Sequence, residues 1–172
     1  DDIVHIIQEE ASEDVLRLSG AGEGDINESP AESYRARIRW LIANLGTALV
    51  ASTVIAFFGG AIEQMVALAI LMPIVAGVGG NAGTQTLAVT VRAIATNQLT
   101  QSNTRRAITR ELTIALFNGA TIAVIAGIGV SLWSGDWHLC AVIAAAMLTN
   151  IVIAGLAGVI IPLTLDQFDQ DP

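Results

Sequence analysis

The chain has 172 residues, of which 53% are apolar and 14% are charged, and its mean hydropathy is +0.62. A soluble domain usually carries about 25% charged residues, so this composition excludes an ordinary soluble domain and indicates a membrane protein. The formal net charge of −8 belongs to the two ends of the chain, and we expect no nucleic-acid partner.

The N-terminal segment is acidic. Apolar residues recur at roughly helical spacing over residues 1–18 and acids fill the other positions, which predicts a short amphipathic cytosolic helix. Such clustered carboxylates either bind divalent cations, which relieve their mutual repulsion, or form a solvated face. The Gly- and Ser-rich stretch 19–30 is a linker. Ser29 as N-cap, followed by Pro30 and Glu32, predicts the start of the next helix.

Four apolar stretches follow. Each is long enough to cross a hydrocarbon core of about 30 Å. The second contains Pro73 and the polar stretch 79–86, so we expect it to be a broken or kinked span. The predicted fold is an all-α membrane protein with a cytosolic segment, residues 1–30, and a transmembrane domain, residues 31–172. The predicted spans cover about residues 40–58, 62–92, 112–133 and 139–165.

The arginines predict the orientation of these spans. Basic residues precede the first span and separate the second from the third, whereas loops 59–62 and 134–138 have none. By the positive-inside rule, both ends of this chain are cytoplasmic in a multi-pass protein of the inner (plasma) membrane. Trp40, Trp133 and Trp137 fall at span ends, as in an aromatic belt at the surface of the lipid bilayer.

The polar stretch in the second span is the main functional candidate. Its glycines weaken a helix, while Asn81, Thr84 and Gln85 add side-chain oxygens. Irregular backbone persists at membrane depth only against protein or water, so this segment can line a cavity. Uncharged oxygen ligands suit Mg²⁺ or Ca²⁺ held through a water shell. The alternative is helix packing through small residues, which is favoured for Gly46, Gly119, Gly127, Gly129, Gly155 and Gly158.

Other polar residues give weaker signals. Asn118 and Asn150 lie inside spans, where interhelical hydrogen bonds are favoured over ion binding. Glu63 and Glu111 lie near span ends, where a solvated position is the default and a role in ion entry is the alternative. Cys140 is expected to be a buried hydrophobic residue. The sequence has no nucleophile triad, phosphate loop or zinc pattern, so we expect no enzyme.

The run from Pro73 to Gln85, PIVAGVGGNAGTQ, followed by Arg92, resembles the second-span signature of the MgtE family of magnesium channels and transporters. The resemblance covers essentially the whole chain. Further likenesses are the Arg35-x-Arg37-x-Arg39-Trp40 entry to the first span, the Arg105-Arg106 pair with Glu111, and the closing Asp171-Pro172.

This resemblance implies a homodimer with a pore along the dimer axis and Mg²⁺ as substrate and regulator. Gly77 and Gly80 match positions that offer backbone carbonyls to a hydrated Mg²⁺, with Asn81 adjacent. Thr84 stands where relatives can carry Asn. Residues 1–18 resemble the end of a regulatory CBS module. The implied regulatory Mg²⁺ ligands are Asp2, Glu10, Glu13, Asp14 and Asp171.

Members of that family have a fifth span with an aspartate that anchors the hydrated ion, and this sequence stops before it. The chain also starts without Met or a signal peptide, so we expect a fragment with an incomplete ion site. The expected function is import of Mg²⁺ into the cytoplasm, regulated by cytosolic Mg²⁺. The alternative is a non-transporting membrane assembly or regulatory module. The expected ion pathway comprises Gly77, Gly80, Asn81, Thr84 and Gln85.

Overall fold

The computed structural model describes residues 29–96, 98–99 and 103–167. In these ranges every regular element is a helix, and four of the helices are long and apolar enough to cross a membrane. The predicted all-α membrane fold is therefore confirmed, whereas the predicted amphipathic helix near the N-terminus lies outside the described residues. The chain divides between Gln64 and Met65 into two parts, which are described in turn.

The first part contains helices α2, Pro30–Phe57, and α3, Gly59–Gln64. The start of α2 is a capping box, as the sequence predicts. The Glu32 backbone N–H donates to Ser29 Oγ at 3.4 Å, and the Ser29 backbone N–H donates to Glu32 Oε2 at 3.1 Å. The short helix α3 was not predicted from the sequence, because its glycines and short length are typical of a loop.

Helix α2 exposes apolar side chains around its whole circumference. None of its most apolar stretch is buried within the first part. A helix with apolar residues on all sides suits a lipid environment or further helices. Its large exposed side chains include Leu41, Ile42, Leu45, Leu49, Val50, Val54 and Phe57.

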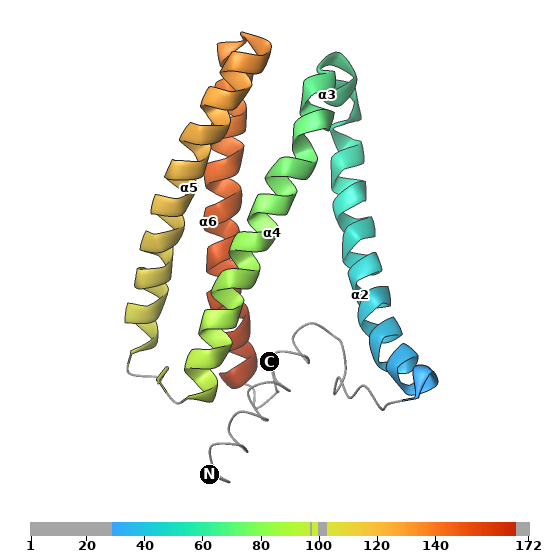
Figure 1. The fold of residues 1–172 in the computed structure, drawn as a ribbon, viewed down its shortest axis with the longest axis vertical. Coiled ribbons are helices and arrows are strands. Elements are labelled where there is room, and N and C mark those ends of the chain that lie inside the picture. Colours follow the sequence, from blue (N-terminus) through green and yellow to red (C-terminus); the bar gives the residue numbers. More distant parts are fainter. Residues whose placement is uncertain (1–28, 97, 100–102, 168–172) are drawn as a thin grey trace. The chain divides into compact units, whose positions relative to one another are not determined.

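The second part contains helices α4, Val66–Ala95, α5, Thr104–Ser134, and α6, Trp137–Gln167. Helix α6 packs against both α4 and α5, and α5 and α6 run side by side along their length (Figure 1). Direct backbone contact between α4 and α5 is marginal at most. Helix α6 is therefore the central element of this part.

A tight turn joins α5 to α6. Gly135 adopts the left-handed conformation, with φ of 66°, and its N–H donates to the Ser131 carbonyl at 2.9 Å. Asp136 then caps α6, because its Oδ1 accepts the His138 backbone N–H at 2.8 Å. This hydrogen bond to the ionised form lowers the pKa of the Asp136 carboxyl.

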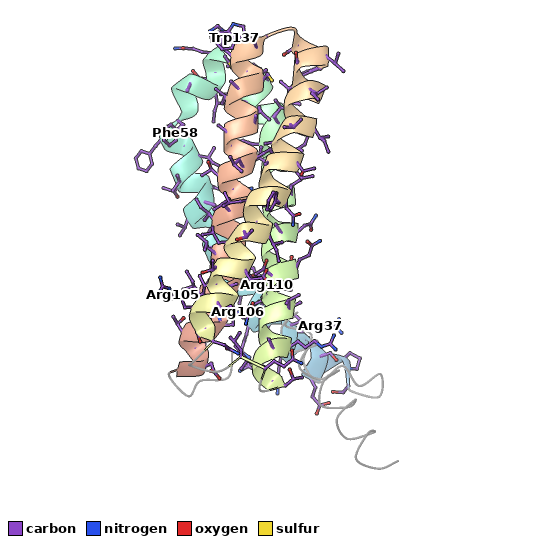
Figure 2. The ribbon with its side chains drawn as sticks, turned by 90° about the vertical axis from the view of Figure 1, so that its left-hand side faces the viewer. Arg37, Phe58, Arg105, Arg106, Arg110 and Trp137 are labelled. Atoms are coloured by element: carbon purple, nitrogen blue, oxygen red, sulfur yellow. The ribbon has the colours of Figure 1, made fainter. Side chains whose placement is uncertain are left out.

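The ends of this three-helix part differ in character. Trp133 and Trp137 flank the turn between α5 and α6 and are exposed. Arg105, Arg106 and Arg110 lie at the opposite end (Figure 2). Exposed tryptophans at one end and arginines at the other are typical of helices that cross a bilayer.

Small residues form the contact between α5 and α6. On α5, Ala115, Gly119, Ala123 and Gly127 are buried at every fourth position. A Cβ added at Gly119 would lie 2.9 Å from the Leu148 side chain. This spacing lets helix backbones approach closely where lipid offers no hydrophobic driving force. The packing role is thus confirmed for Gly119, Gly127, Gly155 and Gly158, whereas Gly46 and Gly129 meet no atom within 4 Å of a built Cβ.

One cluster of buried apolar side chains occupies the half of these helices nearest the turn between α5 and α6. All three helices contribute buried side chains to it, and partly buried Leu68, Val75, Val78 and Ile122 surround them. This cluster consists of Leu71, Ala123, Val130, Leu139, Ile143 and Met147.

Helix α4 continues without interruption through the polar stretch. The structure excludes the expected break at this stretch, and the predicted span 62–92 is interrupted only earlier, at Met65 between α3 and α4. Pro73 lies inside the helix and lacks the N–H that would bond the preceding turn. Gly79 and Gly83 therefore belong to a regular helix, and their lack of a side chain serves contact with α6.

The tightest contact of α4 with α6 involves Gly79 and Asn150. The Asn150 side-chain amide donates to the Val75 carbonyl at 2.5 Å, which confirms the interhelical hydrogen bond predicted for this residue. A Cβ at Gly79 would collide with the Asn150 carboxamide. Farther along, a Cβ at Gly158 would lie 2.8 Å from the Gly83 carbonyl oxygen. Glycine is therefore required on both helices for this approach.

We predict opposite effects for alanine at Gly79 and at Gly77. Gly79→Ala should destabilise the protein by about 1–3 kcal/mol, because the new methyl overlaps Asn150. Gly77→Ala should stabilise it by about 0.5–1 kcal/mol, since alanine favours the helix and a Cβ there meets no atom within 4 Å. The midpoint of thermal unfolding in detergent measures both.

The double variant Gly79→Ala/Asn150→Ala tests whether the clash is the cause. Removal of the carboxamide should make Gly79→Ala less damaging than it is in the presence of Asn150. Additive effects of the two substitutions would contradict the contact.

Candidate ion pathway

Four of the five predicted pathway residues share one exposed face of α4. Gly77, Gly80, Asn81 and Thr84 recur at spacings of three and four and are all exposed. They lie opposite the face that packs on α6, which includes Gly79. We call these four residues the α4 polar face. It combines two glycines, an amide and a hydroxyl, and it carries no charge.

The backbone of the α4 polar face is partly engaged within the helix. The Thr84 hydroxyl donates to the Gly80 carbonyl at 2.6 Å and approaches the Asn81 carbonyl at 3.3 Å. The Thr84 oxygen keeps its lone pairs free to accept from water. A Cβ at Gly77 or Gly80 would meet no atom within 4 Å, so the backbone is open to solvent on this side. The face can therefore hold a water shell through carbonyl, hydroxyl and amide groups.

Gln85, the fifth predicted residue, is also exposed and lies at the edge of this face, one helical turn after Asn81. It lies on the flank of α4 and lines a cavity of about 210 Å³ between α4, α5 and α6. Since a water molecule occupies about 30 Å³ in the liquid, this cavity has room for several. Gln85 thus lies one helical turn after Asn81 and borders both the α4 polar face and this cavity.

Polar side chains from α4 and α5 line this cavity. Gln85 and Thr86 come from α4, and Arg110, Glu111 and Asn118 come from α5. Arg110 Nη1 and Glu111 Oε1 form an ion pair at 2.6 Å. The Glu111 side chain is only 11% exposed and that of Arg110 is 66% exposed. The cavity therefore holds a partly buried carboxylate whose charge is balanced at once by its neighbour.

The ion pair changes the interpretation of Glu111. The sequence favours a solvated acid near a span end, but the side chain is largely shielded and paired. Arg110 was not among the predicted site residues. Its adjacency to Glu111 and the helical spacing from Glu111 to Asn118 were the available signals. Asn118 lines the same cavity and shows no interhelical hydrogen bond in the described structure.

The predicted regulatory ligands are not part of this geometry. Asp2, Glu10, Glu13, Asp14 and Asp171 lie outside the described residues. Among the residues that the structure describes, no group of three or more His, Cys, Asp or Glu side chains is arranged to hold a metal ion. Glu63 in α3 is exposed. The α4 polar face itself therefore offers only neutral ligands, from Gly77, Gly80, Asn81 and Thr84.

Comparison with known proteins places the chain in a family. The family model of MgtE, described as divalent cation transporter, matches residues 72–172, which include most of α4 and all of α5 and α6. The magnesium transporter MgtE of Bacillus subtilis strain 168 is 34% identical over the whole chain, which corresponds to 38% of that protein.

Two further magnesium transporters are similar to the whole chain. The magnesium transporter MgtE of Enterococcus faecalis is 34% identical over the whole chain, which corresponds to 38% of that protein. The magnesium transporter MgtE of Thermus thermophilus is 30% identical over the whole chain, which corresponds to 39% of that protein. The chain thus spans less than two fifths of the length of these relatives. Because the family model matches more than half of its residues, the chain belongs to the MgtE family of divalent cation transporters.

Proposed function

We propose that this chain is the membrane part of a channel or transporter that carries Mg²⁺ into the cytoplasm. The relatives named as magnesium transporters and the family description support this proposal. The observation that carries it is the α4 polar face, an exposed uncharged strip on a helix otherwise suited to lipid. Such a strip in hydrocarbon is costly unless it faces protein or water.

The chemistry of the face fits a hydrated cation. Mg²⁺ gives up its water shell reluctantly and prefers oxygen ligands. Neutral carbonyls, an amide and a hydroxyl accept hydrogen bonds from that shell without holding the ion too strongly to leave. Asn81 and Thr84 supply the side chains, and Gly77 leaves space for water.

We infer that a second copy of the chain covers the α4 polar face and forms a homodimer with the pore on its axis. Two copies related by a twofold axis present the same oxygens from opposite sides, which lines a pore with a minimum of distinct residues. The charge of the ion is then balanced by groups other than the α4 polar face.

Regulation by cytosolic Mg²⁺ is part of the proposal. Clustered carboxylates repel one another, so an arrangement that brings Asp2, Glu10, Glu13, Asp14 and Asp171 close together is stable only with bound Mg²⁺. If that arrangement closes the pore, rising cytosolic Mg²⁺ stops import through its differential affinity for the closed state. Arginines at Arg92 and along the start of α5 support a cytoplasmic position for that end of the helices.

Transport is tested with a chimera. This chain would replace the matching 38% of the Bacillus subtilis relative in a bacterial strain that lacks Mg²⁺ uptake. We expect growth at low external Mg²⁺ and measurable uptake of Mg²⁺. A parallel chimera with the matching segment of the Enterococcus faecalis relative, also 34% identical to this chain, is the control. Uptake by the control alone, with both chimeras present in the membrane, would refute the proposal.

A second experiment tests the α4 polar face. Asn81→Leu in the chimera should lower Mg²⁺ uptake about tenfold, the effect of one lost hydrogen bond of about 1.4 kcal/mol to the hydrated ion. Asn44→Leu is the matched control, because Asn44 is also an exposed amide in an apolar helix. Unchanged uptake in Asn81→Leu would favour the alternative, in which these helices only assemble with others.

A third experiment tests regulation. Neutral amides at the five proposed regulatory acids should keep Mg²⁺ uptake active when cytosolic Mg²⁺ is high, with little change when it is low. The control carries Glu23→Gln, Asp25→Asn and Glu28→Gln in the linker, which remove acidic charge elsewhere. If uptake by both variants still stops at the same cytosolic Mg²⁺ concentration, these acids are not the sensor.

A further inference from the structure

Three arginines gather on the surface of α5 at its first turns. Arg105, Arg106, Thr109, Arg110 and Thr113 line an open surface hollow of about 550 Å³. All five are exposed, and the first turn of α5 contains no acid. We call these five residues the α5 arginine surface, and Figure 2 shows the three arginines at the same end of the helix.

The charges on this surface are not all balanced. Arg110 is paired with Glu111, whereas within the described ranges no carboxylate forms an ion pair with Arg105 or Arg106. The Thr109 and Thr113 hydroxyls donate to carbonyls of their own helix at 2.9 and 2.8 Å. The surface thus offers a ligand the guanidinium N–H groups of Arg105 and Arg106 and a net positive charge. Guanidinium groups bind phosphate oxygens in a fork geometry that suits an anion with several oxygens.

The position along α5 narrows the choice of anion. Helix α5 has the length and hydropathy of a membrane span, so its first turns lie at the level of lipid headgroups. Phe117 follows Arg110 by seven residues, which places it on the same side of the helix and about 10 Å deeper. It is 72% exposed and its neighbour Leu116 is 47% exposed. A phosphate near the arginines with an acyl chain along Phe117 uses both features, whereas a soluble phosphate uses only the first.

We propose that the α5 arginine surface binds the headgroup phosphate of an anionic phospholipid, whose acyl chain lies along Phe117. This site is separate from the α4 polar face and does not depend on the proposed transport of Mg²⁺. It fixes the depth of α5 in the bilayer through a specific lipid contact, beyond the general preference of arginines for one side of the membrane.

The experiment measures lipid retained by the purified protein. Protein equilibrated with mixed micelles of phosphatidylglycerol and phosphatidylcholine is repurified, and bound lipid is quantified by mass spectrometry. We expect the wild type to retain phosphatidylglycerol selectively. Arg105→Gln/Arg106→Gln should weaken this binding about 25-fold, since each arginine near a lipid surface contributes about fivefold. Arg105→Lys/Arg106→Lys, which keeps the charge but lacks the guanidinium fork, should bind more weakly than the wild type and more tightly than the glutamine variant.

Arg35→Gln/Arg37→Gln is the matched control, because it removes the same number of exposed arginines from α2. It should change retention less than twofold. Equal losses in the two glutamine variants would mean diffuse attraction and overturn the site. Displacement of the lipid by millimolar glycerol phosphate would assign the arginines to a soluble phosphate and overturn the lipid. The unfolding midpoint of each variant shows that it is folded.

Discussion

The close approach of α4 to α6 determines which side of α4 packs and which side stays open. Gly79 faces the Asn150 carboxamide, and Gly158 faces the Gly83 carbonyl, so that the two backbones nearly touch. With one side of α4 held in this way, its helical period places the α4 polar face on the other side. The residues that pack and the residues that remain open are thus two faces of one continuous helix. A side chain at Gly79 would shift both together.

The bilayer explains why these contacts use small residues. Lipid tails are as apolar as Leu, so burying a large apolar side chain between helices gains little free energy there. Close packing and hydrogen bonds provide the stabilisation instead. Helix α6 shows both, since Gly155 lies against Ala115 and the Asn150 amide bonds to the Val75 carbonyl. Larger side chains are buried as well, and Met147, Val159 and Pro162 of α6 are almost completely enclosed.

Hydropathy and local chemistry predicted the long helices well. Spans 112–133 and 139–165 fall within α5 and α6, span 40–58 ends one residue after α2, and span 62–92 covers the end of α3 and most of α4. The capping box at Ser29 forms as expected. These features depend on local composition and on neighbouring residues. The interhelical bond of Asn150 also follows from a local rule, because an amide in hydrocarbon needs a partner.

Local sequence reasoning could not predict two features, the packing role of the glycines in α4 and the place of Gln85 in a cavity. Glycine weakens a helix and also permits close helix contact, so its presence in α4 does not distinguish a break from a packing face. Contact with the partner helix α6 determines that these glycines form a packing face. Local sequence does not show this contact, because Asn150 lies 71 positions after Gly79 in the chain. Likewise, Asn81 and Gln85 are close in sequence, but only the placement of α5 makes Gln85 part of a cavity.

The uncharged α4 polar face has a consequence for ion passage. An intact helix uses its backbone carbonyls in its own hydrogen bonds, so they accept a second bond from water more readily than they replace a water ligand of Mg²⁺. Within the described residues, the partly buried carboxylate of Glu111 is already neutralised by Arg110. On the proposed pathway, a hydrated ion would keep its shell, and the attraction for a divalent cation would come from charges outside the α4 polar face.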